Sequence, residues 1–396
     1  MNILIIPSWF GDNESPNAGI FFKDEATLVA SSNYVILMVF DRVSVTETSM
    51  NEDTEIEYSI KSKPINNRLT IIRIKLPFNE KLCWEDNIKA FQPHVFKVFD
   101  TIYHKFKVDI IHAYATFYGG IFAHWISTAY HIPYIITEHF GPFNPDFLHS
   151  NYVKNEMIEA INESNSFICV STHLRQQILM QGILRDSLVI GNYVNDKLFQ
   201  INDKSSEDNL LLTVAYYPSY IKDIKTLMEA YSILVKQGLD FKAIIVGGGE
   251  IKGGYHGYNP VTDMVSEFNL TQYVRVIGSV SHNEMARLMQ KCSFYISSSI
   301  AETFGVSICE AMLCGKPCVV TKNGGSMDFT NENNSIVVDI HQPRELAAGI
   351  IRMMTNRKNF NPNTIRKHIV QKYGTETFLR KINEIYSLTM NTYAEH

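Results

Sequence analysis

Short apolar runs alternate with amphipathic segments along the chain, and the alternation occurs twice. The apolar runs predict buried strands, and the segments between them carry apolar residues at helical spacing. In the first half, strands are predicted at residues 2–7, 34–40, 69–76, 109–113, 133–137, 166–171 and 187–192. Helices are predicted at residues 20–31, 85–106, 119–130, 158–164 and 172–181, the last capped by Thr172, and residues 43–63 are predicted as loop or irregular strand.

The pattern restarts after a polar run at residues 202–209, which marks a domain boundary. Strands are predicted at residues 210–215, 242–246, 274–278, 294–297, 319–321 and 335–338. Helices are predicted at residues 224–237, 260–268, 281–291, 306–313, 343–355, 362–372 and 375–391, the third of them with a capping box formed by Ser281 and Glu284. Because strands and helices alternate in each half, each half should be an α/β domain with helices on both faces of a parallel sheet.

Length and charge narrow the class of protein. A chain of 396 residues is too long for one ordinary core, so two domains are expected. The composition, 45% hydrophobic and 19% charged, is that of a globular protein. Residues 1–190 carry 15 basic against 21 acidic side chains, and the whole chain has a net charge of −5. This balance gives no argument for a nucleic-acid partner, while a local patch for peripheral membrane contact stays open.

The cysteines and the apolar segments indicate the compartment. None of the six cysteines forms a C-x-x-C pair, which favours a reduced, cytoplasmic protein. The start of the chain has no basic region of the kind found in signal peptides, and no apolar run is long enough to span a bilayer. We therefore expect a cytoplasmic location, open to contact with the inner face of the membrane.

The stretch from Tyr295 to Gly325 carries the most specific chemistry. It predicts a strand, a polar loop with Glu302, a helix with Glu310 two turns in, and a second strand. The loop lies at the carboxyl end of a strand, where open α/β sheets bind ligands. Backbone N–H groups of residues 304–307, at the helix start, would suit phosphate oxygens. The carboxylates would suit sugar hydroxyls.

The string ETFGVSICE, followed by AMLCGKPCV and GG, resembles the donor-sugar motif of retaining GT-B glycosyltransferases of family GT4. Either glutamate alone is better explained as an ordinary helix residue, but the whole string in its strand–loop–helix context favours the motif. The resemblance implies the GT-B fold, with two Rossmann-like, doubly wound domains facing across a cleft. It implies an acceptor-binding domain at residues 1–195, a donor-binding domain at 205–374, and a final helix, 375–391, that packs back on the first domain.

The resemblance also assigns donor-binding residues. Gly19 matches a Gly-x-Phe-like element near the donor phosphates, and Lys222 matches the lysine placed on the diphosphate. The arginine that usually accompanies this lysine is replaced by Tyr216, and Lys225 or a residue of the first domain could substitute for it. The string VIGNYVNDKLF at 189–199 resembles the hinge that closes the first domain, with glycine where proline is usual. The motif itself implies donor contacts from Phe304, Gly305, Val306 and Glu310.

Two histidines and a glycine run complete the set of candidates. His139, in ITEHFG, resembles the first-domain histidine that faces the reacting sugar, so His139 and Glu302 are the implied catalytic residues. His112, in DIIHAY, either lines the acceptor pocket or is a buried structural histidine. Residues 247–249 and 275–279 match places where the family holds the nucleoside, partly by main chain.

The implied function is retaining transfer of a sugar from a nucleotide-diphosphate sugar to a hydroxyl of a glycan or lipid-linked acceptor, in cell-surface polysaccharide or glycoconjugate biosynthesis. The chain contains no Asp-x-Asp, the usual signature of metal-dependent glycosyltransferases, so neither a metal nor another cofactor is expected. Two alternatives remain: a GT-B sugar-nucleotide epimerase or hydrolase, and a non-catalytic sugar-nucleotide-binding subunit, which the missing arginine suggests.

Overall fold

The structure is a computed structural model that describes residues 1–11, 19–44, 63–202, 207–215, 219–247 and 260–394. It divides into two compact units, unit 1 with residues 1–190 and 378–396, and unit 2 with residues 191–377. Tyr216 and the glycines at 248–249 lie outside the described residues, so the expectations for them stay as they are.

Unit 1 is built on a single sheet with strand order β3-β4-β2-β1-β5-β6-β7-β8. Among the described strands, only β3 runs antiparallel to its neighbour, at one edge. The strands are β1 (Asn2–Pro7), β2 (Tyr34–Ser44), β3 (Lys63–Asn66), β4 (Leu69–Phe78), β5 (Ile110–Tyr114), β6 (Tyr134–Glu138), β7 (Ser166–Cys169) and β8 (Leu188–Val189).

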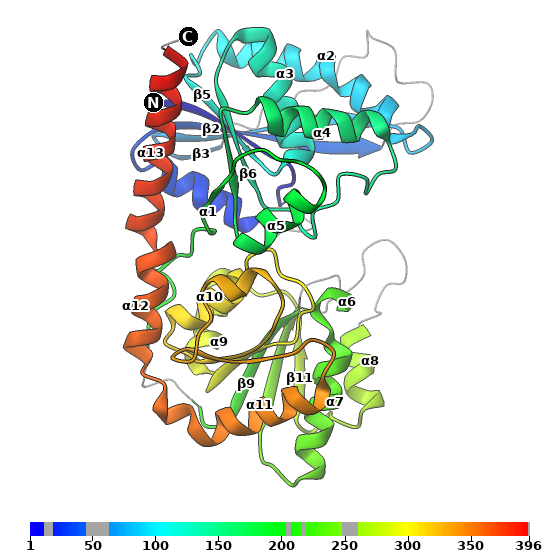
Figure 1. Ribbon diagram of the computed structural model, residues 1–396, viewed down its shortest axis with the longest axis vertical. Coiled ribbons are helices and arrows are strands. Elements are labelled where there is room, and N and C mark those ends of the chain that lie inside the picture. Colours follow the sequence, from blue (N-terminus) through cyan, green and yellow to red (C-terminus); the bar gives the residue numbers. More distant parts are fainter. Residues whose placement is uncertain (12–18, 45–62, 203–206, 216–218, 248–259, 395–396) are drawn as a thin grey trace. The chain divides into compact units, whose positions relative to one another are not determined.

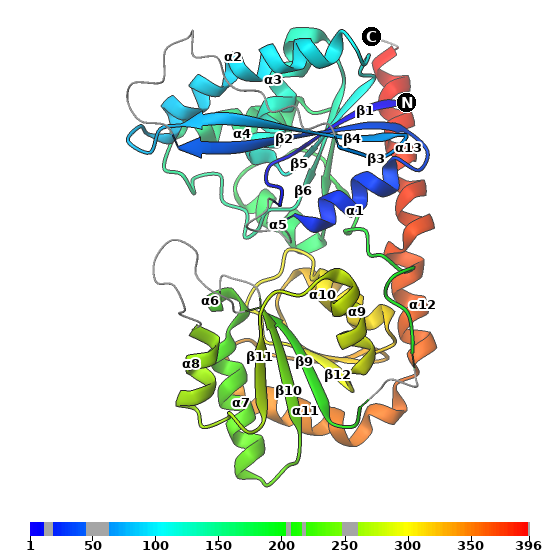
Figure 2. The same cartoon turned by 180° about the vertical axis from the view of Figure 1, so that it is seen from behind.

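Helices cover both faces of this sheet, with α1 and α13 on one face and α2, α3 and α4 on the other (Figures 1 and 2). Their bounds are α1 (Ile20–Val29), α2 (Trp84–Tyr103), α3 (Ile121–Tyr130), α4 (Asn151–Glu163), α5 (Thr172–Met180) and α13 (Thr375–Ala394). A short irregular helix, η2 (Thr116–Gly120), links β5 to α3. The helix α13 starts in unit 2 and belongs to unit 1 from Phe378 onwards.

Unit 2 has a six-stranded sheet, in which all pairs are parallel and the order is β11-β10-β9-β12-β13-β14. The strands are β9 (Leu210–Ala215), β10 (Lys242–Gly247), β11 (Val274–Ile277), β12 (Phe294–Ser297), β13 (Cys318–Thr321) and β14 (Ser335–Val338). The helices are α6 (Ser219–Lys222), α7 (Ile224–Lys236), α8 (Pro260–Glu267), α9 (His282–Lys291), α10 (Val306–Leu313), η4 (Gly325–Asp328), α11 (Pro343–Asn356), η5 (Arg357–Asn359) and α12 (Pro362–Tyr373).

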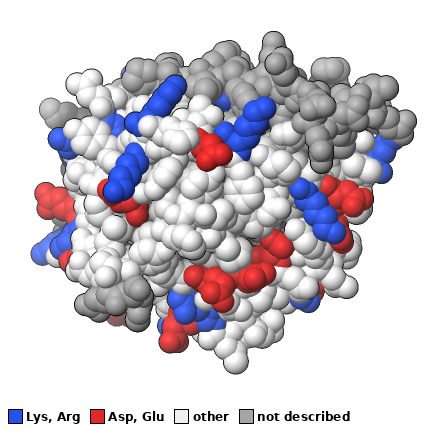
Figure 3. Space-filling view, turned by 90° about the horizontal axis from the view of Figure 1, so that it is seen from above, with Lys and Arg blue, Asp and Glu red and all other residues white. Residues whose placement is uncertain are grey.

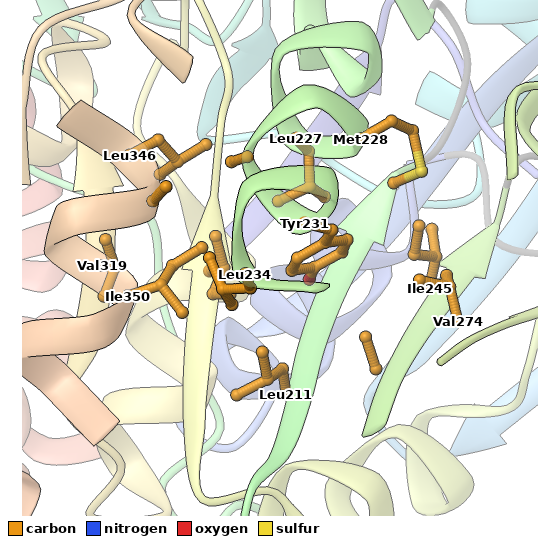
Figure 4. Packing of buried hydrophobic residues seen from close by; sticks show 14 of the residues in the cluster. Leu211, Leu227, Met228, Tyr231, Leu234, Ile245, Val274, Val319, Leu346 and Ile350 are labelled. Carbon is orange, nitrogen blue, oxygen red and sulfur yellow. The ribbon is translucent and has the colours of Figure 1, made fainter. Parts of the chain in front are cut away.

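The core of unit 2 lies between its sheet and the helices α7 and α11. Tyr231 and Leu234 of α7 point towards Leu211 of β9, and Ile350 of α11 packs beside them (Figure 4). All four side chains are almost fully buried. Removing so much apolar surface from water holds the sheet rigid, which fixes the carboxyl ends of its strands.

Most predicted elements occur in the structure, and the differences have local causes. The helix predicted from residue 158 begins at Asn151, where the Ser150 hydroxyl accepts a hydrogen bond from the N–H of Val153. Thr172 was wrongly predicted as a cap, because the hydroxyl of Ser171 accepts from the N–H of Leu174. The strand predicted at residues 187–192 contains only two residues, Leu188 and Val189, and both are exposed.

Charged side chains are mixed rather than segregated on the face shown in Figure 3, where basic and acidic groups alternate around apolar and neutral surface. No broad field of one sign extends over the described part of that face. A phosphate backbone is bound by clustered lysine and arginine, and the described residues on this face show no such cluster.

Candidate active site

In unit 2, the carboxyl ends of β9 and β12 form a candidate site. These strands are parallel neighbours, so the segments that follow them emerge at the same edge of the sheet. The sheet is extended by β10 on one side of β9 and by β12 on the other, and such a switch point is where doubly wound sheets bind ligands. Lys222 ends α6 after β9, and Glu302 lies in the loop after β12.

Lys222 and Glu302 form an ion pair at this site. Lys222 Nζ lies 2.6 Å from Glu302 Oε1, and the Ser299 hydroxyl donates to the same oxygen at 2.7 Å. The two charged side chains are 20% and 14% exposed, so each can still meet a ligand. Sequence reasoning identified the lysine and the glutamate, but it missed both their pairing and Ser299.

Hydrogen bonds to the segment that follows β13 fix the backbone of Glu302. Its N–H donates to the Asn323 carbonyl at 2.8 Å, and its carbonyl accepts from the N–H of Gly325 at 2.9 Å. The Asn323 side-chain oxygen accepts from the Ser326 hydroxyl at 2.8 Å. The Gly324–Gly325 turn after β13 therefore holds the loop that carries the carboxylate.

Gly325 leaves no room for a side chain, so we expect the Gly325→Ala variant to be destabilised by about 1–3 kcal/mol. An added Cβ would lie 2.3 Å from the Thr303 carbonyl oxygen, and this contact with backbone cannot be relieved by a rotamer change. Chemical denaturation measures the free energy of unfolding. The control is Gly278→Ala, whose Cβ would meet nothing within 4 Å. Equal stability of the two variants would contradict the expectation.

The helix α10 begins at Val306, four residues after Glu302. Gly305 is the N-cap and has φ +99°, a conformation that glycine adopts without strain, and it has no side chain with which to cap the helix. Phe304 is buried, with its ring 4.9 Å from that of Tyr373. The amides of Val306 and Ser307 suit an anion, because they precede the first N–H that donates within the helix, that of Ile308 to the Gly305 carbonyl at 3.0 Å.

Glu310 lies inside α10 and is nearly buried. Its Oε1 is 3.4 Å from Nε2 of His282, the first residue of α9. His282 is the second residue that sequence reasoning missed, since nothing in its own pattern distinguishes it from an exposed helix residue. The glutamate and the histidine therefore form a polar pair at the amino end of α9.

In unit 1, His139 follows the carboxyl end of β6 and is 6% exposed. Its ring lies among three aromatic rings, with centroids 4.9 Å from Phe22, 5.4 Å from Phe21 and 5.5 Å from Tyr114. Gly19 starts the helix that carries two of these rings, and it has φ +61°. The structure thus brings His139 and the Gly19 turn into one neighbourhood within unit 1.

Glu138, immediately before His139, is completely buried. One of its oxygens accepts from the backbone N–H groups of His139 at 3.0 Å and Phe140 at 2.8 Å. The other accepts from the N–H of Thr116 at 2.9 Å and from the Thr116 hydroxyl. Burial raises the pKa of Glu138, and these hydrogen bonds oppose the increase.

His112 lies in the middle of β5 and is also buried. Its Nδ1 is 2.7 Å from the Tyr386 hydroxyl of α13, and its Nε2 is 2.8 Å from the Thr137 hydroxyl. Both ring nitrogens are therefore engaged within unit 1. This arrangement favours the second interpretation left open above, a buried structural histidine, over a residue that lines an acceptor pocket.

We expect His112 to make unit 1 sensitive to acid. Burial, and secondarily the charge of His139, lower the pKa of His112 from 6.5 to about 3. As pH falls below 6.5, the unfolded chain binds a proton that the folded protein excludes, so stability is lost between pH 6.5 and about 3. The loss should reach about 2 kcal/mol by about pH 5.

Denaturation midpoints for the wild type and His112→Gln between pH 7 and pH 5 test this expectation. The variant should start less stable and lose less stability on acidification. His104→Gln, which changes an exposed histidine at the end of α2, should follow the wild type. A parallel decline of His112→Gln and the wild type would show that His112 does not carry the effect.

The described residues contain no group of three or more His, Cys, Asp and Glu side chains placed to hold a metal ion. Across the same residues, no helix is both long enough and apolar enough to cross a bilayer.

Comparison with known proteins shows the family of this chain. The profile of the family "Glycosyl transferases group 1" matches residues 194–371, and that of "Glycosyltransferase Family 4" matches residues 64–198. The chain belongs to the GT4-type glycosyltransferases. A relative of this glycosyltransferase, an uncharacterised glycosyltransferase of Methanocaldococcus jannaschii, is 25% identical over 299 residues, which span 74% of this chain and 79% of that protein.

Solved structures show that this glycosyltransferase has the GT-B fold. Sucrose-phosphate synthase from Thermosynechococcus elongatus superposes with a TM-score of 0.79 at 15% identity, covering 99% of both chains. Anabaena HepE in complex with UDP-glucose superposes with a TM-score of 0.72 at 19% identity, covering 98% of this chain and 99% of that one. The predicted fold class, two Rossmann-like parallel-sheet α/β domains, is confirmed, apart from the antiparallel edge strand β3.

Proposed function

We propose that this glycosyltransferase is a retaining, metal-independent enzyme that moves a sugar from a nucleotide-diphosphate sugar to a hydroxyl of a glycan or lipid-linked acceptor. The observation that carries the proposal is the Lys222–Glu302 pair beside the amino end of α10. A cation, a carboxylate and the first amides of a helix at one switch point match the needs of a diphosphate joined to a sugar.

Each donor group has a partner in this proposal. The α10 amides and Lys222 bind the diphosphate, Glu302 accepts hydrogen bonds from hydroxyls of the transferred sugar, and Glu310 binds the ribose. Charge-assisted hydrogen bonds of this kind are roughly twice as strong as neutral ones. UDP is the first nucleotide to test, since HepE, which shares the fold, was crystallised with UDP-glucose.

The chemistry is a displacement in which the acceptor oxygen attacks the anomeric carbon on the face that the diphosphate leaves. A bond forms between that oxygen and the anomeric carbon, and the bond from the carbon to the phosphate oxygen breaks. The acceptor proton passes to the departing phosphate. Fixed positive groups at the leaving oxygens stabilise the charge that develops there. Lys222 and α10 supply them, which is why no metal is required.

The acceptor side is proposed for unit 1. His139 acts near the reacting sugar. Beyond it, the rings of Trp9, Phe140 and Phe147 follow one another, with centroids 6.3 and 5.5 Å apart. Aromatic faces of this kind suit the apolar side of a sugar ring or a lipid chain. We further propose that the enzyme works in the cytoplasm on acceptors for cell-surface glycoconjugates.

The test combines binding and transfer. Titration calorimetry with UDP and UDP-glucose measures donor binding, and release of UDP is followed with and without glycan and lipid-linked acceptors, each in buffer containing EDTA. We expect UDP release that depends on acceptor and persists in EDTA. Complete loss in EDTA, restored only by Mg²⁺ or Mn²⁺, would exclude the metal-independent mechanism.

The same measurements separate the alternatives. Release of UDP without any acceptor would indicate a hydrolase or epimerase. Binding of UDP-glucose without release under any condition would indicate a non-catalytic subunit. Product analysis by NMR reports the anomeric configuration, and an inverted product would overturn the retaining assignment.

A further inference from the structure

A strained turn in unit 1 lies at the point where β1, β5 and β6 end. Ala115, directly after β5, has φ 65° and ψ 151°, a region that almost only glycine occupies. Tyr118, three residues on, has φ 58° and ψ −72°. Non-glycine residues keep such conformations only where the surroundings fix them. The turn therefore requires specific restraints.

Two side chains supply these restraints. The Ser8 hydroxyl, after β1, donates to the carbonyls of Tyr114 at 2.8 Å and Ala115 at 3.0 Å, and it accepts from the N–H of Gly119 at 3.1 Å. The buried Glu138 carboxylate accepts from Thr116 on the other side of the same turn. Ser8 thus ties the turn to β1, and Glu138 ties it to β6.

Glu138 also fixes the backbone that carries His139. The oxygen that does not face Thr116 accepts from the N–H groups of His139 and Phe140. One carboxylate therefore joins the strained turn after β5 to the residue proposed to act near the reacting sugar. An ionised carboxylate offers two acceptor oxygens and no proton. A glutamine at this position would turn its NH₂ group towards one of the two pairs of donors, and donor would then face donor.

We propose that Glu138 is a positioning residue for turnover, because its carboxylate locks the ends of β5 and β6 together and so sets the place of His139. The link to turnover rests on the proposed function, whereas the locking itself does not. Glu138 does not touch substrate. It acts through the backbone of His139, and a displacement of about 1 Å at a reacting group can cost about a hundredfold in rate.

The test uses the full chain with Glu138→Gln, which keeps the shape and replaces one acceptor oxygen by a donor. Hydrogen exchange read by mass spectrometry should show faster exchange in the segments that contain Thr116, His139 and Phe140. Turnover with UDP-glucose should fall by about tenfold to a hundredfold, while the affinity for UDP, which unit 2 is proposed to bind, stays at the wild-type level. Thr116→Val, which removes only the hydroxyl donor, should give a smaller change in the same direction.

The matched control is Glu156→Gln, in the same unit. The carboxylate of Glu156, a residue of α4, accepts a hydrogen bond from Nε1 of Trp125 at 2.6 Å, and the glutamine variant keeps an acceptor oxygen there. We expect wild-type turnover and wild-type exchange at residues 115–121 and 138–141. If Glu138→Gln misfolds, the hydrogen exchange, turnover and UDP affinity of Thr116→Val decide whether the proposal holds.

Unchanged exchange in the two segments would overturn the proposal, and so would wild-type turnover of a folded Glu138→Gln variant. An equal loss of UDP affinity and turnover would also overturn it, because positioning in unit 1 should not affect nucleotide binding. The exchange measurement needs no substrate. A wild type that neither binds UDP nor turns over UDP-glucose would therefore exclude this donor from the proposed function, while the exchange result would still decide whether Glu138 locks the two strand ends.

Discussion

Glu302→Gln should lower sugar transfer by about tenfold to a hundredfold and leave the affinity for UDP almost unchanged. The carboxylate is proposed to accept hydrogen bonds from the transferred sugar, and loss of a charge-assisted bond in a dry site costs about 1.5–3 kcal/mol. UDP lacks the transferred sugar, so its affinity should not depend on the hydrogen bond that this variant loses. Lys222, which lies 2.6 Å from Glu302, keeps its positive charge for the diphosphate.

Glu310→Gln is the matched comparison, since it makes the same chemical change about one turn into α10. Its proposed partner is the ribose, which UDP and the intact donor share, so both should bind about ten- to a hundredfold more weakly. Titration with UDP and UDP-glucose, beside a turnover assay, separates the two roles. If Glu302→Gln weakens UDP binding as much as Glu310→Gln does, the roles are wrongly assigned. If neither variant changes anything, the donor site does not lie at this edge of the sheet.

Lys222→Met should weaken binding of UDP and UDP-glucose by about tenfold to a hundredfold, and it should also slow transfer. Methionine keeps the apolar stem of the side chain and removes the charge that is proposed to neutralise the diphosphate. The loss also leaves Glu302 without its cation, and a carboxylate that is only 14% exposed then lies close to the phosphates. Like charges repel at this distance, so the two effects act in the same direction.

The same measurements on Lys236→Met give the control, because Lys236 is an exposed lysine in the last turn of α7. We expect wild-type affinity and transfer there. The salt dependence of UDP binding should also flatten in Lys222→Met, since one fewer ionic contact is screened. Unchanged UDP affinity in Lys222→Met would remove this lysine from the diphosphate site and leave the α10 amides as its main binding group.

The sequence was sufficient to predict the order and type of most elements, because each strand is a short apolar run and each long helix has an apolar stripe. It also indicated Lys222 and Glu302, both of which follow strands of the second half. It could not show that β9 and β12 are neighbours, which is what brings the lysine and the glutamate to 2.6 Å. Strand order depends on the packing of the helices that connect the strands, and no local pattern records it.

Residues missed by the sequence share one property, that their role comes from contacts distant along the chain. His282 meets Glu310 across two helices, and Glu138 meets Thr116 across two strands, 22 residues apart in the chain. The sequence left His112 open between the acceptor pocket and a buried structural role, and its partner Tyr386 is 274 residues away. Long-range hydrogen bonds of this kind leave no periodicity for sequence reasoning to detect.

The sequence by itself determined the α/β class of each half, because that class follows from the alternation of apolar runs and amphipathic segments, and it singled out the ETFGVSICE motif at one strand–loop–helix turn. The tertiary structure decided which side chains face one another. Switch points in the two sheets bring Lys222 to Glu302 in unit 2 and place Ser8 and Glu138 around the strained turn in unit 1. The reason is physical: parallel strands deliver their following loops to one edge of the sheet, but only the packed core determines which strands are adjacent there.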